Sequence, residues 1–131
     1  MKKVMAQGSF DILHPGHVHY LRESKKLGEE LVVVIARDSR VSGMKDLVFS
    51  EQERREMVEA LGMVDKAILG SEEDIYSTVE KVDPEVITLG YDQDHREEKV
   101  KEMAERATGH DVGVERIDEL EGYSSSRIRD F

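Results

Sequence analysis

Short hydrophobic runs alternate along this chain with polar segments whose apolar residues recur at helical spacing. Leu31–Ala36 is the clearest run, because it is continuously apolar and rich in β-branched residues, as expected of a strand that is covered on both faces. Further strands are predicted over Val4–Gln7, Val64–Leu69, Val86–Leu89 and Val112–Ile117. Helices are predicted between them, over Gly16–Lys26, from Ser50 onward, over Asp74–Val82 and over Glu97–Ala107, with a last helical turn or two from Ser124.

Several element ends carry signals of their own. Ser50 and Glu53 have the spacing of a capping box, so a helix should begin directly after Ser50. Gly28 is expected to cap the end of the first helix. The polar segment Arg37–Val48 is predicted to be a loop.

The alternation of strands and helices predicts an α/β fold, a Rossmann-like, doubly wound, five-stranded parallel sheet within a single domain over residues 1–131. In such sheets ligands bind beyond the carboxyl ends of the strands. Three notable segments fall at those ends, namely Gly8–His17, Gly90–Gln93 and Gly122–Arg127. We therefore expect them to contribute to one ligand site.

Composition narrows the class of protein. The 29 acidic residues exceed the 19 basic ones, for a formal net charge of −10, which argues against general nucleic-acid binding but not against a nucleotide site. The absence of cysteine excludes disulfides, thiolate zinc sites and cysteine nucleophiles. No apolar run approaches the roughly 18 residues of a membrane span. Since the first residues also lack the apolar core of a signal peptide, we expect a cytoplasmic protein without membrane contact.

The first of the three segments carries the strongest chemical signal. His14 and His17 flank a Pro15–Gly16 turn directly after a predicted strand. An isolated pair would more often be ordinary capping or surface histidines, and two histidines leave a zinc site short of ligands. Here, however, Gly8 lets the backbone approach a ligand closely, and N–H groups at the start of a helix bind anions. The segment is therefore predicted to bind phosphate.

The stretch Gly8-Ser9-Phe10-Asp11, followed by His14-Pro15-Gly16-His17, closely resembles the signature of the nucleotidyltransferase superfamily. Members of that superfamily carry a histidine–any–glycine–histidine motif after their first strand. The resemblance implies that both histidines contact the triphosphate and stabilise charge as pyrophosphate leaves. It also implies that all of these residues line the nucleotide site, and that the protein is a homodimer.

A serine-rich segment near the end of the chain is the second match to the superfamily. Ser124, Ser125 and Ser126 precede Arg127, as serines or threonines precede a basic residue in the family. Serine also favours the first position of a helix, so an ordinary cap is the alternative. The resemblance implies that the three serines bind the nucleotide and that Arg127 adds positive charge.

Three further positions take expected roles from the same resemblance. Gly90, Asp92 and Gln93 match a loop that contacts the nucleoside in the family. Lys45 lies in the loop where the family places a lysine over the phosphates, although a solvated lysine is an equal alternative. Arg54 stands where the family has an arginine that opens a helix, and it is expected either to support the site or to form an ordinary ion pair.

The implied reaction is direct transfer of a nucleoside monophosphate. A phosphate oxygen of the acceptor attacks the α-phosphorus of a nucleoside triphosphate, and no general base is needed because that phosphate is already a nucleophile. Catalysis is then positioning and charge stabilisation by His14, His17, Lys45 and Arg127. A divalent cation, Mg²⁺ or else Co²⁺ or Mn²⁺, would bridge phosphate oxygens, held by one carboxylate and several waters.

Two subfamilies of this size fit the chain. One is the archaeal-type FAD synthase, which uses ATP and FMN, and the other is glycerol-3-phosphate cytidylyltransferase, which uses CTP and a polyol phosphate. Glu119 stands where the cytidylyltransferases usually carry a nucleotide-binding arginine, whereas Arg54–Leu61 and Leu89–Gln93 follow the FAD synthase pattern. The C-terminal cysteines of some FAD synthases are absent. We expect ATP and FMN, with CTP and a polyol phosphate as the alternative and a non-catalytic nucleotide sensor as a second one.

Overall fold

The computed structural model describes residues 2–11, 13–41, 49–71, 74–90 and 96–118. In these ranges the strands β1 (Lys3–Gly8), β2 (Glu30–Ile35), β3 (Lys66–Leu69), β4 (Val86–Leu89) and β5 (Gly113–Arg116) form one sheet. Their order is β3-β2-β1-β4-β5, and every pairing is parallel. The predicted α/β fold with a five-stranded parallel sheet is confirmed.

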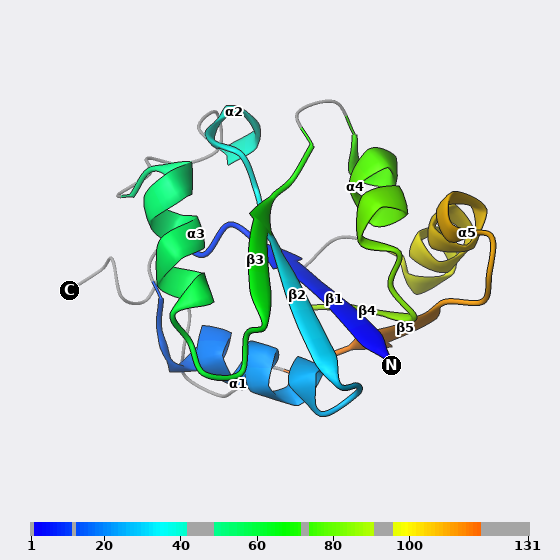
Figure 1. Cartoon of the computed structure of the whole chain (residues 1–131), viewed down its shortest axis with the longest axis horizontal. Coiled ribbons are helices and arrows are strands. Elements are labelled where there is room, and N and C mark those ends of the chain that lie inside the picture. The colour runs from blue at the N-terminus through cyan, green and yellow to red at the C-terminus, as the bar shows by residue number, and fades with distance from the viewer. Residues whose placement is uncertain (1, 12, 42–48, 72–73, 91–95, 119–131) are drawn as a thin grey trace.

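Helices cover both faces of the sheet (Figure 1). The helices α1 (Pro15–Lys25) and α3 (Glu51–Glu59) lie on one face, and α4 (Ile75–Val82) and α5 (Glu97–Thr108) lie on the other. The short helix α2 (Asp38–Val41) follows β2. None of the helices in the described ranges is long and apolar enough to cross a membrane.

The core is divided between the two faces by the alternation of side chains along the strands. Val4 and Ala6 of β1 pack with buried residues of α1 and α3, whereas Met5 packs with buried residues of α4 and α5. This division explains why the inner residues of β1 (Val4–Ala6) and of β2 (Leu31–Ile35) are all apolar, since both faces of a central parallel strand are covered.

β1 lies at the centre of the sheet, and the order in which the strands are added reverses there. It winds outward through β2 and β3, then crosses to β4 and β5 on the other side of β1. The switch point therefore lies between β1 and β4, and ligands of such sheets bind at the carboxyl ends of the strands on either side of it.

Two local predictions were wrong. Part of the segment expected to be a loop forms α2. The first helix ends at the C-cap Lys26 rather than at Gly28. Gly28 instead passes close to β1, because a Cβ there would lie 2.6 Å from the carbonyl oxygen of Lys2. The capping box of Ser50 and Glu53, in contrast, is confirmed at the start of α3.

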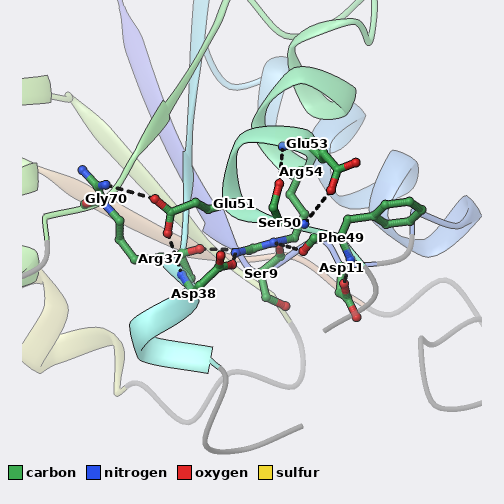
Figure 2. A network of polar contacts seen from close by, with 11 residues as sticks. Ser9, Asp11, Arg37, Asp38, Phe49, Ser50, Glu51, Glu53, Arg54 and Gly70 are labelled. Atoms are coloured by element: carbon green, nitrogen blue, oxygen red, sulfur yellow. Dashed lines mark hydrogen bonds and ion pairs between the residues drawn. The ribbon is translucent and has the colours of Figure 1, made fainter. Parts of the chain in front are cut away.

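A buried arginine joins the carboxyl end of the sheet to α3 (Figure 2). Arg54 is 0% exposed, and its Nη1 donates to the carbonyl oxygens of Ser9 at 2.7 Å and Ala36 at 2.9 Å. Its Nε donates to the carbonyl oxygen of Phe49 at 3.2 Å, and its Nη2 pairs with Asp38 Oδ1 at 2.6 Å. One guanidinium thus fixes the segments that follow β1 and β2 relative to the start of α3.

A second layer of contacts holds Asp38 in place. Its backbone N–H donates to Glu51 Oε1 at 2.9 Å, and Glu51 Oε2 accepts from Arg37 Nη1 at 3.1 Å. Arg37 Nε in turn donates to the carbonyl oxygen of Gly70, beyond β3. The carboxyl ends of β2 and β3 are therefore linked to the same network of polar contacts (Figure 2).

Arg54→Lys is expected to destabilise the fold strongly. Lysine keeps the charge but loses the planar set of N–H donors, so buried carbonyl groups such as that of Ser9 lose their partner. Since each buried unsatisfied group costs about 1–3 kcal/mol, the free energy of unfolding in a denaturant titration should fall by at least about 2 kcal/mol. Arg55→Lys is the matched control, because Arg55 bonds only at the surface of α3, to Gln52 and Glu59, among the described contacts. Equal losses in the two variants would contradict the role given to Arg54.

A surface histidine should make stability depend on pH. His110 Nδ1 lies 2.8 Å from the carbonyl oxygen of Asp111, and its Nε2 lies 2.9 Å from Asp83 Oδ1. The carbonyl group, and then the carboxylate, raise the pKa of His110 above its ordinary value of 6.5. A raised folded pKa means that the stabilisation is fully present below the unfolded pKa and is lost as the pH rises through the folded pKa. Asp83→Asn should lower the pKa of His110 in an NMR titration, while asparagine still tolerates the left-handed φ of 55° at this position. An unchanged pKa would refute this coupling.

Candidate active site

The two motif histidines lie where β1 leads into α1. His14 is the N-cap of α1, with extended backbone (φ −147°, ψ 170°), and Pro15 occupies the first helical position that proline favours. The N–H of Gly16 donates to His14 Nδ1 at 3.0 Å. A nitrogen that accepts carries no hydrogen, so Nε2 is the donor nitrogen of a neutral His14.

Three aromatic rings form a column at this helix start. The rings of His14 and His17 are stacked, with centroids 3.8 Å apart and planes 24° apart. Phe10 meets His17 edge to face, with centroids 5.2 Å apart. His14 at the N-cap and His17 in the first turn therefore present their stacked imidazoles together at the positive end of α1.

Phe10 is held in an uncommon backbone conformation, with a φ of 51°. Its ring is 2% exposed and lies against Gly8, where a Cβ would be only 2.9 Å from two ring atoms. Gly8 is therefore needed for the position of the Phe10 ring, whether or not a ligand approaches its backbone. The glycine, the phenyl ring and His17 form one packed unit.

The other predicted residues of this segment also support its shape. Asp11 is 1% exposed, and its Oδ1 accepts the N–H of Phe49 at 3.1 Å, just before α3. Ser9 is held through its carbonyl oxygen by Arg54 (Figure 2). The side chains of Phe10 and Asp11 thus face the protein interior, where their contacts fix the backbone around the histidines.

Arg54 pairs with Asp38, but its side chain is buried and does not form an ordinary ion pair at the helix surface. Its buried guanidinium reaches the histidine segment only through Ser9 among the described contacts. The prediction that Arg54 supports the site therefore takes a specific form, in which the arginine positions the backbone that precedes the histidines.

On the other side of the switch point, an unpredicted arginine holds the end of β4. Arg116 Nη1 donates to the carbonyl oxygen of Gly90 at 2.7 Å, and its Nε donates to Glu97 Oε1 at 2.6 Å. Arg116 ends β5 and Glu97 begins α5, so neither stood out in the sequence from other charged residues of a highly charged chain.

The remaining predicted site residues lie outside the described ranges. They are Lys45, Asp92, Gln93, Ser124, Ser125, Ser126 and Arg127. Within the part of the chain that the structure describes, no group of three or more His, Asp or Glu side chains could hold a metal ion. The structure places the described residues of the histidine segment after β1 and Gly90 after β4, and these two strands flank the switch point.

Known proteins are similar to this chain over most of its length. A protein of Picrophilus torridus named FAD synthase is 52% identical over 130 residues, covering 97% of this chain and 93% of that protein. An FAD synthase of Ferroglobus placidus is 50% identical over 131 residues, covering 98% of this chain and 86% of that protein.

A solved structure has the same fold. It is described as a lipopolysaccharide core biosynthesis protein from Thermoplasma volcanium, and it superposes with a TM-score of 0.87 at 48% identity. The match covers 92% of this chain and 99% of that chain.

The family described as cytidylyltransferase-like matches residues 5–131, which include every residue of the histidine segment. The stacked histidines at the start of α1 therefore lie within a family-wide match and not in an isolated motif. The chain belongs to the cytidylyltransferase-like family and is a nucleotidyltransferase.

Proposed function

We propose that the chain is an FAD synthase, which transfers AMP from ATP to FMN and releases pyrophosphate. The observation that carries the proposal is an identity of about 50% to proteins named FAD synthase over nearly the whole chain. The site is consistent with it, because His14 and His17 lie at a helix start at the switch point of the sheet.

The reaction forms one bond and breaks another at the same phosphorus. A phosphate oxygen of FMN attacks the α-phosphorus of ATP, and the bond from that phosphorus to the oxygen bridging to the β-phosphate breaks. The electron pair leaves with pyrophosphate, so negative charge grows on the leaving group. His14 Nε2 and the His17 ring lie at the positive end of α1, where they would stabilise that charge by hydrogen bonding.

A divalent cation would neutralise phosphate charge when it is bound. We propose that one carboxylate of the chain and several waters would hold the cation against the triphosphate. Mg²⁺, or else Co²⁺ or Mn²⁺, suits such oxygen ligands.

The residues outside the described ranges complete the proposal by resemblance alone. Lys45 and Arg127 would add positive charge at the phosphates, and Ser124, Ser125 and Ser126 would bind them. Asp92 and Gln93, after Gly90, would contact the nucleoside. That the protein is a homodimer and lies in the cytoplasm also stays a prediction. The dimer would be refuted if sedimentation at micromolar concentration showed monomer and no dimer.

Pyrophosphate release should require ATP and FMN together. We would measure it with Mg²⁺, Co²⁺ or Mn²⁺, for ATP or CTP against FMN, glycerol 3-phosphate and phosphocholine. Release with CTP and a small phosphorylated alcohol alone would make the chain a cytidylyltransferase. Nucleotide binding without release in any combination would favour the sensor.

His14→Ala and His17→Ala should each lower kcat by on the order of 10²-fold or more, since these groups act on charge that develops in the transition state. The affinity for ATP, measured by calorimetry, should fall far less. His19→Ala is the matched control, because two positions along α1 turn its side chain roughly 200° from His17. Parallel losses of binding and rate in the two motif variants, or an equal loss in the control, would contradict a catalytic role.

A further inference from the structure

The pairing between β1 and β4 stops early. β1 pairs with β2 along its whole length, from Lys3 to Gly8, but it pairs with β4 only at Val4 and Met5. The strands therefore separate towards their carboxyl ends, at the switch point where a ligand is expected.

A tyrosine hydroxyl stands where the next backbone hydrogen bond would form. In a continued parallel ladder, the N–H of Gln7 would donate directly to the carbonyl oxygen of Thr88. Instead, the N–H of Gln7 donates to the Tyr20 hydroxyl at 3.3 Å, and that hydroxyl donates to the Thr88 carbonyl oxygen at 2.9 Å. Tyr20 comes from α1, so a helix side chain is inserted into the sheet.

The inserted hydroxyl belongs to a buried polar cluster. Thr88 Oγ1 donates to the Tyr20 hydroxyl at 3.2 Å and lies 2.8 Å from Ser24 Oγ. Ser24 Oγ also donates to the carbonyl oxygen of Tyr20 at 2.8 Å. Ser24 and Thr88 are 0% exposed and Tyr20 is 8% exposed, so the geometry is fixed by packing as well as by hydrogen bonds.

We propose that Tyr20 is a positioning residue that sets the separation between the two halves of the nucleotide site. β1 leads to the histidine segment and β4 leads to Gly90, so the distance between these strand ends sets the span that one triphosphate must bridge. The hydroxyl holds the strand ends one oxygen atom further apart than a direct backbone bond would. This inference rests on the proposed function, because only a ligand that contacts both halves responds to their separation.

Tyr20→Phe tests the proposal by removing the oxygen and keeping the ring. ATP would contact both halves, whereas pyrophosphate would contact only the histidine side. By calorimetry with Mg²⁺, the Kd of ATP should rise about tenfold, since the two hydrogen bonds that fix the span are lost, while that of pyrophosphate should change less than about twofold. A merely structural role would lower the unfolding temperature without changing the ratio of the two constants.

Two control variants separate the span from general loosening. Tyr76→Phe removes an exposed hydroxyl that donates to the carbonyl oxygen of Arg106 on α5. Thr88→Val removes a hydroxyl from the same buried cluster but keeps the carbonyl oxygen that Tyr20 bonds. Both should keep the wild-type ratio of the constants. The same ratio in Tyr20→Phe as in wild type, or the same shift in Thr88→Val, would overturn the proposal.

A measurement on the wild type keeps the test decisive if Tyr20→Phe does not fold. The amide hydrogen of Gln7 should exchange as slowly as those of β1 that pair with β2, because the Tyr20 hydroxyl holds it. Fast exchange at Gln7 would refute the inserted hydrogen bond. The assay of the wild type with ATP and FMN judges the proposed function separately.

Discussion

One buried guanidinium determines how the carboxyl end of this sheet is arranged. Arg54 donates to carbonyl oxygens that follow β1 and β2, and its charge is compensated by Asp38. A buried charge is tolerated only when it is paired and hydrogen-bonded, so these partners hold one another in place. The backbone at Ser9, which leads to Phe10 and the two histidines, is therefore held in position by a residue of α3.

A short series of contacts connects Arg54 and Ser9 to the two histidines and fixes the positions of their rings. Gly8 leaves room for the Phe10 ring, the ring meets His17, and His17 stacks on His14, whose Nδ1 is held by a backbone N–H. In the proposed reaction, donors held in this way would stabilise developing charge without having to reorganise. Gly8, Phe10 and the N–H of Gly16 thus serve to hold the two imidazoles in fixed positions.

The parts of the fold that were predictable have local causes. The β-branched residues of Leu31–Ala36 predict a strand that is covered on both faces. The capping box of Ser50 and Glu53 predicts the start of α3. The prediction that Gly28 caps the first helix is wrong, because the glycine is required by its close approach to Lys2, which is distant in the sequence. The burial of Arg54 and the insertion of Tyr20 likewise depend on strands brought together by folding, so no pattern of neighbours indicated them. The histidine pair was found through its motif, whereas its support by Phe10 needed the structure.

The central claim is that this arrangement joins AMP to FMN. The most direct measurement is the molar yield of FAD and of pyrophosphate from ATP, FMN and a divalent cation, with FAD separated by chromatography and identified by its mass. The account predicts that the two products form in a one-to-one ratio and that neither forms without FMN. Pyrophosphate without FAD, or no FAD with any of the three cations, would contradict it.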